Sequence, residues 1–345
     1  LQPLGIGRAS ASSPSLSFEG ETLNVVGVLG AVGVGLASDT KPRVVLFALQ
    51  LLEFVARDPR THPVLEHAKA VPLLVRLAAD SGADVLIHEL EDFTAPALRP
   101  AAREIAPRVL AAWKARGCVA AVRVNPLAGD GRDDLDAVMH GAPDLVMLPK
   151  VSEPSHVTGL EDAVLAAEQS LGLQTSVTEL VPNIELARGL IQTYDICNAS
   201  PRVKCALVAS VDMATDLGAE RSRDGEELKY VRARFHVECV AAGVVSIDAP
   251  YTWTDDAGTE AEARYARQLG YTAKSAVNPD HAAVINEVFT PSAADIAKAQ
   301  RIVAAFEAAQ ANGDGRVELD GSLVEVPIYR NAQTLLARAE ALSAY

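Results

Sequence analysis

Short apolar runs alternate with amphipathic stretches along most of this chain. The runs have the length of buried strands, and the stretches between them repeat apolar residues at helical spacing. Eight such runs begin about 25–40 residues apart, at 43–49, 84–90, 120–125, 144–150, 178–185, 204–212, 244–248 and 271–277. Eight strands alternating with helices predict an α/β fold, a (β/α)8 TIM barrel. An open, doubly wound sheet is the alternative, because a strand count from sequence can err by about one or two.

The two ends of the chain depart from this alternation. Residues 1–40 form a predicted extension, in which 1–20 are rich in Ser, Gly and Ala and predicted to be disordered, and 23–38 are apolar but short for a membrane span. The barrel is predicted over 41–291. Residues 292–345 predict a C-terminal helical extension with Ser292 as its first cap. This extension cannot bury its apolar side alone, so we expect it to pack on its own barrel or on a neighbouring subunit.

Composition indicates a globular protein of a reducing compartment. Hydrophobic residues make up 49% of the sequence with few aromatics, as expected for parallel strands buried on both faces. The formal net charge of −14 argues against a continuous basic patch for nucleic acid. The four cysteines are scattered without a CxxC pair, which favours free thiols. We therefore predict a cytoplasmic protein with no nucleic-acid or membrane partner.

Two acidic residues follow neighbouring predicted strands. Glu185 and Asp212 each end an apolar run, and they lie 27 residues apart, about one strand–helix–strand repeat. In a parallel barrel, the carboxyl ends of neighbouring strands meet at the face that carries active sites. Two carboxylates there, with room for water and a substrate oxygen, suit Mg2+. The alternative is that both acids cap helix N-termini and interact with the helix dipoles.

Other polar residues end the remaining predicted strands. Taken singly, each is equally consistent with a salt bridge or a helix cap. Together they predict an acidic pocket with a few cations, able to bind a divalent metal and an oxo acid, where metal and arginine stabilise an enolate. The set comprises Glu89, Glu91, Asp92, Arg123, Asn125, Lys150, Asp248, Lys274 and Asn278.

The order of six short motifs carries a family resemblance. They are DVLIHELEDFT (84–94), AVRVNP (121–126), DLVMLPK (144–150), NIELARGL (183–190), DMATDLG (212–218) and FTP (289–291). Over about residues 43–340, the chain resembles the citrate lyase beta-subunit-like family of the HpcH/HpaI aldolase superfamily, which includes malyl-CoA and citramalyl-CoA lyases. The resemblance implies a TIM barrel, Mg2+-dependent cleavage or formation of a carbon–carbon bond, and a homotrimer or hexamer.

The resemblance also implies roles for individual residues. Glu185 and Asp212 are expected to bind the metal, and Arg123 to hold the carboxylate or carbonyl of the oxo acid and stabilise enolate charge. In the family's lyases an acid of the C-terminal tail reaches a neighbouring active site for proton transfer, and Glu325 stands where the family has Asp. The expected substrate-binding residues are Arg43, Glu91, Asp92, Arg123 and Lys150.

The implied reaction is cleavage of a 3-hydroxyacyl-CoA of the citryl, malyl or citramalyl type. It yields an oxo acid or oxaloacetate plus an acyl-CoA through a metal-stabilised enolate, with Mg2+ (or Mn2+) as cofactor and the CoA thioester as substrate. One departure concerns CoA: residues 47–51 replace the Pro-Gly turn that shapes the family's CoA-binding side. Two alternatives are therefore kept, a class II oxo-acid aldolase without CoA and a catalytically silent metabolite-binding homologue.

Overall fold

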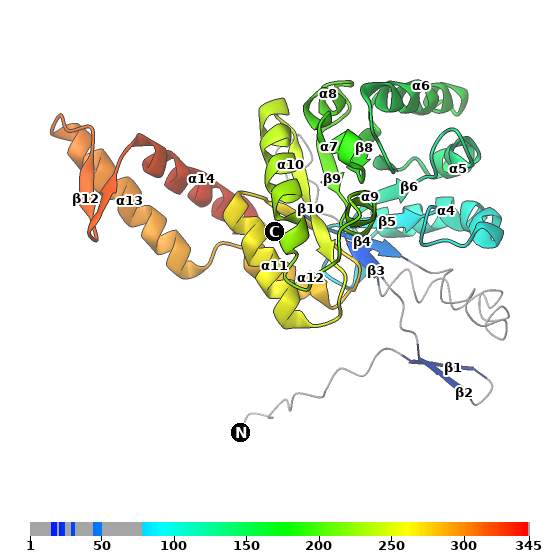
Figure 1. Cartoon of the computed structure of the whole chain (residues 1–345), viewed down its shortest axis with the longest axis horizontal. Coiled ribbons are helices and arrows are strands. Elements are labelled where there is room, and N and C mark those ends of the chain that lie inside the picture. The colour runs from blue at the N-terminus through cyan, green and yellow to red at the C-terminus, as the bar shows by residue number, and fades with distance from the viewer. Residues whose placement is uncertain (1–14, 19–20, 25–28, 32–43, 50–77, 344–345) are drawn as a thin grey trace.

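Eight parallel strands close into a barrel. The computed structural model describes the strands at 15–18, 21–24, 29–31 and 44–49, and residues 78–343 in full. Neighbouring strands pair in chain order, and β11 returns to β4 through the register pair Ser275–Leu46, which closes the sheet (Figure 1). The predicted (β/α)8 TIM barrel is confirmed. Its strands are β4 (Val44–Leu49), β5 (Val85–Glu89), β6 (Val119–Arg123), β7 (Leu145–Leu148), β8 (Glu179–Ile184), β9 (Cys205–Val208), β10 (Val245–Tyr251) and β11 (Ala273–Ala276).

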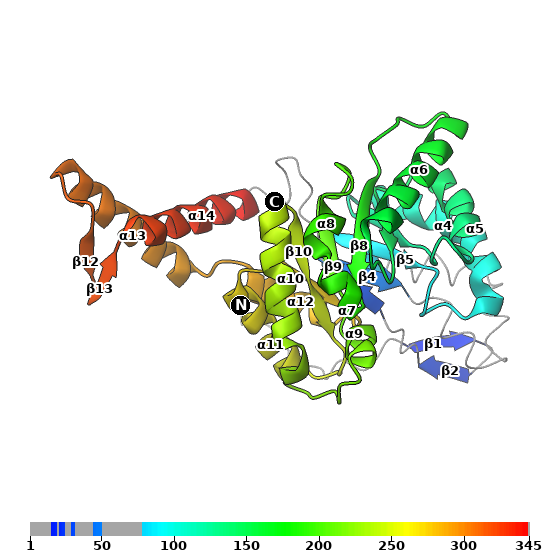
Figure 2. The ribbon, with the colours of Figure 1, turned by 45° about the horizontal axis from the view of Figure 1, so that its top comes forward.

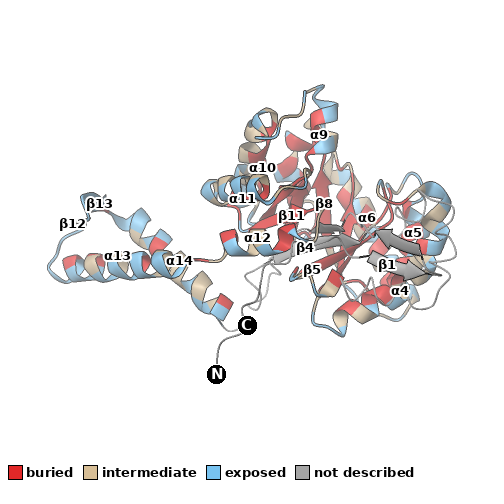
Figure 3. Ribbon diagram, turned by 90° about the horizontal axis from the view of Figure 1, so that it is seen from below, coloured by how far each residue is buried: buried red, intermediate tan, exposed pale blue. Residues whose placement is uncertain are grey.

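Helices surround the barrel because each carries one apolar face. In α4 (Arg99–Lys114) the buried residues recur at helical spacing, at Ala102, Ala106, Val109, Leu110 and Trp113. Figure 3 shows buried residues concentrated in the strands and on the helix faces that cover them. The other outer helices are α5 (Gly131–Val138), α6 (Pro154–Ser170), α8 (Thr193–Cys197), α10 (Lys229–Ala242), α11 (Asp256–Leu269) and α12 (His281–Phe289).

Two short helices follow strands at the barrel mouth, α7 (Ala187–Leu190) after β8 and α9 (Val211–Asp216) after β9. A carboxylate oxygen of Asp216 in α9 accepts a hydrogen bond from the backbone N–H of Ala187 at 2.7 Å. Asp216 therefore caps α7 and ties the two loops together.

The N-terminal segment contributes three short strands. Strands β1 (Ser15–Phe18) and β2 (Glu21–Asn24) pair antiparallel with each other, whereas β3 (Leu29–Ala31) pairs antiparallel with β4 and contacts β11. The predicted extension over 1–40 thus contains these strands in its described part. Its other residues, and Arg43, lie outside the described residues.

The C-terminal segment forms an arm that projects from the barrel. It consists of α13 (Ala293–Ala311), the hairpin β12 (Val317–Leu319) and β13 (Ser322–Val324), and α14 (Val326–Ser343) (Figures 1 and 2). Ser292 caps α13, accepting from Asp295 N–H at 3.1 Å while the Asp295 side chain accepts from Ser292 N–H. Phe306 stacks on Tyr329 at 4.7 Å between ring centroids, joining the two helices. Among the helices described, none is long and apolar enough to cross a bilayer.

Candidate active site at the barrel mouth

Arg123 lies at the centre of an acidic cluster at the carboxyl ends of the strands. It ends β6 beside Glu89 of β5, and its Nε donates to Glu89 Oε2 at 2.7 Å. Its Nη2 lies 3.6 Å from Glu91 Oε2, and its Nη1 lies 3.9 Å from Glu185 Oε1. Burial opposes the charge, but the three carboxylates hold the pKa of Arg123 above its usual range. Arg123 is therefore a fixed cation placed between β5 and β8.

The loop after β5 turns its acids toward a second cation. The backbone N–H of Glu91 donates to Glu89 Oε1 at 2.7 Å, and that of Asp92 donates to Glu91 Oε2 at 2.9 Å. Lys150 Nζ pairs with Glu91 and, at 2.8 Å, with Asp92 Oδ2. Lys150 has a left-handed backbone with φ of 55°, a conformation that costs about 1–3 kcal/mol in a residue with a side chain. Strain of this kind is typical of functional sites, and here it lies in a residue whose side chain pairs with two acids of the site.

Glu185 is a buried carboxylate without hydrogen bonds. It follows β8, its exposed fraction is 0%, and among the described residues neither of its oxygens has a hydrogen-bond partner. Burial raises the pKa of Glu185 to about 8; Arg123 and Lys150 oppose this rise, while Asp212 and Glu91 add to it. Leaving a buried carboxylate unpaired is costly, so this position favours a bound cation.

Glu185 and Asp212 fit a magnesium ion of the usual protein type. Asp212 lies in the first turn of α9, close enough to Glu185 for its charge to raise the pKa of Glu185. Over the described part of the chain, no group of three or more His, Cys, Asp or Glu residues is arranged to hold a metal. Mg2+ commonly uses only one or two protein carboxylates and completes its shell with water and substrate oxygens. Two neighbouring carboxylates therefore suffice for such an ion.

Asn183 is a buried polar residue next to the site segment that sequence reasoning missed. It lies on β8 two residues before Glu185, which follows the strand directly. Asn183 is fully buried, and in the described structure neither its side-chain oxygen nor its nitrogen has a partner. The available signal was a polar residue inside an otherwise apolar strand.

Two residues expected in this pocket lie elsewhere. Asp248 of β10 accepts from Arg232 of α10 at 2.7 and 2.8 Å and from Lys274 of β11 at 2.6 Å, all three being buried. Neighbouring residues of a strand point to opposite faces, and here Asp248 and Lys274 face the helix layer. The prediction that they join the acidic pocket is wrong, and they form a separate ion-pair cluster.

Asn125 is also structural. Its side-chain amide donates to Leu90 O and to Asp134 Oδ2, both at 2.7 Å, and fixes the loop after β6. Glu325 is exposed at the junction of β13 and α14, in the arm that projects from the barrel (Figures 1 and 2). The structure thus brings together Glu91, Asp92, Arg123, Lys150, Glu185 and Asp212, whereas Glu325 stands apart from them.

Known proteins resemble this chain in sequence and fold. A model of the HpcH/HpaI aldolase/citrate lyase family matches residues 67–279. The citrate lyase subunit beta of Escherichia coli (strain K12) is 33% identical over 260 residues, covering 75% of this chain and 86% of that protein. The L-malyl-CoA/beta-methylmalyl-CoA lyase of Cereibacter sphaeroides (strain ATCC 17025) is 30% identical over 295 residues, covering 79% and 92%. The crystal structure of CitE from Mycobacterium tuberculosis, in complex with magnesium, acetoacetate and coenzyme A, aligns with a TM-score of 0.63 and 26% identity, covering 80% and 94%.

Proposed function

This chain belongs to the HpcH/HpaI aldolase/citrate lyase family, and from that membership we propose that it is a Mg2+-dependent carbon–carbon lyase. Its substrate in this proposal is a 3-hydroxyacyl-CoA of the citryl, malyl or citramalyl type. The products are an oxo acid or oxaloacetate and an acyl-CoA. The observation that carries the proposal is the pairing of a bare buried carboxylate, Glu185, with the fixed cation Arg123 at one barrel mouth.

Glu185 and Asp212 are the residues proposed to hold Mg2+, or Mn2+ in its place. When bound, the ion supplies positive charge to the oxygens of the oxo acid and of the developing enolate. The relative from M. tuberculosis was solved with magnesium and CoA, which supports both the metal and the thioester.

Arg123 is proposed to bind the carboxylate or carbonyl of the oxo-acid part. Its Nε contact to Glu89 fixes the plane of the guanidinium, and because its pKa is raised it stays charged throughout the reaction. Lys150, positioned by Glu91 and Asp92, is the second cation available to substrate oxygens. Arg43 is proposed on the same substrate side from its match to the family.

Cleavage moves two protons. A base takes the proton of the 3-hydroxyl group, the carbon–carbon bond breaks, and its electron pair passes to the thioester as an enolate. A second group then protonates the former α-carbon. We assign proton transfer to Glu325 of a neighbouring subunit, because this acid is exposed and belongs to the arm, which projects from its own barrel.

The arm also supports a homotrimer or hexamer. Around Glu325 it exposes Leu323, Val326 and Ile328, which are 46%, 40% and 39% exposed. Apolar groups at such a position are typical of a subunit contact. We propose a cytoplasmic enzyme assembled through this arm.

A CoA-independent class II aldolase is the alternative function, favoured by the altered residues 47–51. Calorimetry with Mg2+ separates the two functions, titrating acetyl-CoA, propionyl-CoA and free CoA with and without glyoxylate or pyruvate. Thioester binding that strengthens with the oxo acid is the expected result. Oxo-acid binding without any response to CoA means the aldolase, and no binding at all supports a catalytically silent homologue.

A further inference from the structure

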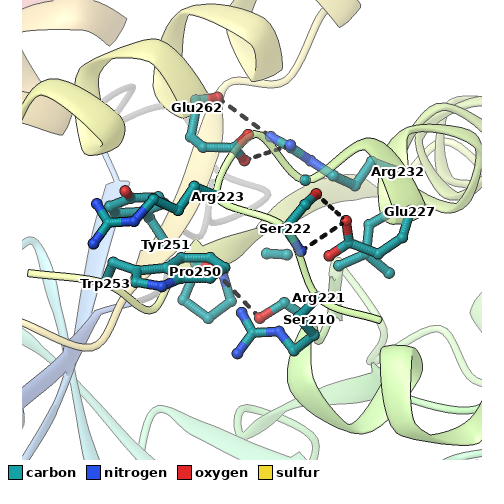
Figure 4. A pocket seen from close by; sticks show the side chains of 13 residues that line it. Ser210, Arg221, Ser222, Arg223, Glu227, Arg232, Pro250, Tyr251, Trp253 and Glu262 are labelled. Atoms are coloured by element: carbon teal, nitrogen blue, oxygen red, sulfur yellow. Dashed lines mark hydrogen bonds and ion pairs between the residues drawn. The ribbon is translucent and has the colours of Figure 1, made fainter. Parts of the chain in front are cut away.

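A pocket lies at the carboxyl ends of β9 and β10. Its wall is built from the end of β10 at Ala249 to Tyr251, from Trp253, and from the loop 221–225 that follows α9 (Figure 4). Ser210, two residues before Asp212, also lines the pocket and donates to Pro250 O at 3.3 Å. The pocket therefore neighbours the proposed metal site without sharing its residues.

Arg221 is the unusual residue of this pocket. Its Nη2 donates to Thr252 Oγ1 at 2.6 Å, and its Cζ lies 4.7 Å from the centroid of the Trp253 ring. Its Nε is buried and has no hydrogen-bond partner among the described residues. Within the same residues, no carboxylate forms an ion pair with Arg221. A guanidinium held against a ring with a buried free donor lacks an anionic partner.

The acids that line the pocket are already engaged. Glu262 pairs with Arg232, and Glu227 accepts hydrogen bonds from the hydroxyl and the N–H of Ser222 (Figure 4). The other exposed cation, Arg223, pairs with Asp255 at 3.0 Å. Arg221 is thus the pocket cation whose charge no described carboxylate balances.

The aromatic wall limits what can bind. Arg221 covers the Trp253 ring, and Tyr251 packs against the same ring at 5.4 Å between centroids. Both neighbours occupy the indole, so a flat ring such as a nucleobase gains little by stacking there. A compact anion that reaches the guanidinium fits better.

We propose that Arg221 forms an anion subsite in this pocket, which takes a carboxylate or phosphate group of a small ligand. The guanidinium donates its remaining Nη hydrogens to oxygens of the anion, while Thr252 and Trp253 hold its plane. The subsite does not rest on the proposed function, because it needs neither the metal nor a thioester.

Tryptophan fluorescence gives a readout that is independent of activity. The chain has two tryptophans: Trp253 contacts Arg221, whereas Trp113 lies fully buried in α4. Protein freed of metal on a chelating resin is titrated with inorganic phosphate and, separately, with succinate, at ionic strength held constant with chloride. Succinamide, the neutral analogue of succinate, is the ligand control. A saturable change that Trp253→Phe abolishes is the expected result.

Variants at Arg221 decide the assignment. We expect Arg221→Gln to weaken anion binding by at least about tenfold and Arg221→Lys to weaken it less, since Lys keeps the charge but loses the planar fork. Arg264→Gln removes the same charge from an exposed pair on α11 and should bind as the wild type does. Saturation by phosphate alone identifies a phosphate ligand, and saturation by succinate alone a carboxylate. No saturable response to either anion overturns the proposal, as does unchanged affinity in Arg221→Gln or, if that variant does not fold, in Arg221→Lys.

Discussion

Arg123 Nη1 lies 3.9 Å from Oε1 of Glu185, close enough to attract it and too far to donate a hydrogen bond. The cation therefore lowers the electrostatic cost of the buried carboxylate without occupying its oxygens. Both oxygens of Glu185 stay available to a further positive partner. This spacing separates a metal-ligand role for Glu185 from that of an ordinary salt bridge.

Glu185→Gln should abolish turnover and Mg2+ binding. The amide has a similar shape but no charge, so the ion loses one of its two proposed protein ligands. In a thermal-shift titration, the wild type should gain stability with Mg2+ as expected for a ligand that binds the folded state, and the variant should not. Glu260→Gln removes an exposed acid on α11 and is the matched control. A full Mg2+ shift in Glu185→Gln would rule out this ligand.

Glu185 should make the metal-free protein less stable as the pH rises. Burial raises its pKa from 4.5 to about 8, so between these values the folded state keeps a proton that the unfolded chain has released. The stability that Glu185 contributes is complete below about pH 4.5 and is lost as the pH rises through 8. Urea unfolding at pH 5.5 and 8.5 should show a larger fall for the wild type than for Glu185→Gln. Equal falls would contradict the assignment.

Mg2+ binding should release a proton at pH 6.5 and almost none at pH 9.5. At the lower pH, Glu185 carries a proton that the ion must displace, whereas above a pKa of about 8 it is already ionised. Calorimetry in two buffers of different ionisation enthalpy measures the number of protons released. Glu89, whose pKa burial raises to about 7, keeps its bond to Arg123 and should contribute little. Release that does not change with pH would refute the prediction.

Arg123→Gln should lower kcat/KM by about 10²–10³-fold, the range seen when one preorganised charge-stabilising donor is removed. Arg123→Lys should recover little of the lost activity, because the single ammonium group of lysine cannot contact Glu89 and the substrate at once as the planar guanidinium can. Steady-state kinetics with the thioester found by calorimetry measure this effect. Arg116→Gln, at an exposed pair with Asp80, is the control and should retain wild-type kinetics. Retained activity in Arg123→Gln would exclude a role in the reaction.

Mixing two inactive variants should restore activity if the arm acts between subunits. Glu325→Gln removes the proposed proton-transfer acid, and Glu185→Gln removes the proposed metal ligand on the barrel. An assembly that contains both chains can combine an intact barrel with an intact arm from its neighbour. Co-expression with two different tags, followed by purification on both, gives the mixed assembly for assay. Mixed assemblies as inactive as their parents would place the action of Glu325 within one chain or exclude it.

Asp248→Asn should destabilise the fold strongly. The substitution leaves the buried cations Arg232 and Lys274 without their shared carboxylate, and breaking a buried pair in this way costs about 3–5 kcal/mol. Urea unfolding measures the loss, and Asp133→Asn, at an exposed acid of α5, is the control. A change below 1 kcal/mol, in the scale of surface substitutions, would mean that the cluster is not structural.

The sequence predicted the strands well because parallel strands buried on both faces form continuous apolar runs. It also placed Glu185, Arg123 and Lys150 at one mouth, since their position after successive strands follows from the fold. It could not tell which face of a strand Asp248 uses, because the predicted run ended at this residue, whereas β10 continues to Tyr251. The packing of α10, which brings Arg232 against β10, decides that question.

Arg221 and Asn183 escaped prediction for a different reason. Arg221 lies in a loop whose path depends on Trp253, a residue of the next loop, so no local pattern marks it. Asn183 is a single polar residue within an apolar strand. It becomes informative only once the structure shows that its side chain has no hydrogen-bond partner among the described residues. Unsatisfied groups are a property of three-dimensional packing rather than of residue order.

The hydrogen bond from Ala187 to Asp216 has a consequence for selectivity. Ala187 lies two residues after Glu185, and Asp216 lies four after Asp212, so this one bond latches the two segments that carry the proposed ligands. The two proposed ligands are thereby tied to each other before any ion arrives. A pair of ligands restrained in this way suits a small ion that demands near-ideal octahedral geometry. It disfavours a larger ion that needs six to eight oxygens. The hydrogen bond between Ala187 and Asp216, which contacts neither ion, would thus favour Mg2+ over Ca2+ at the proposed site.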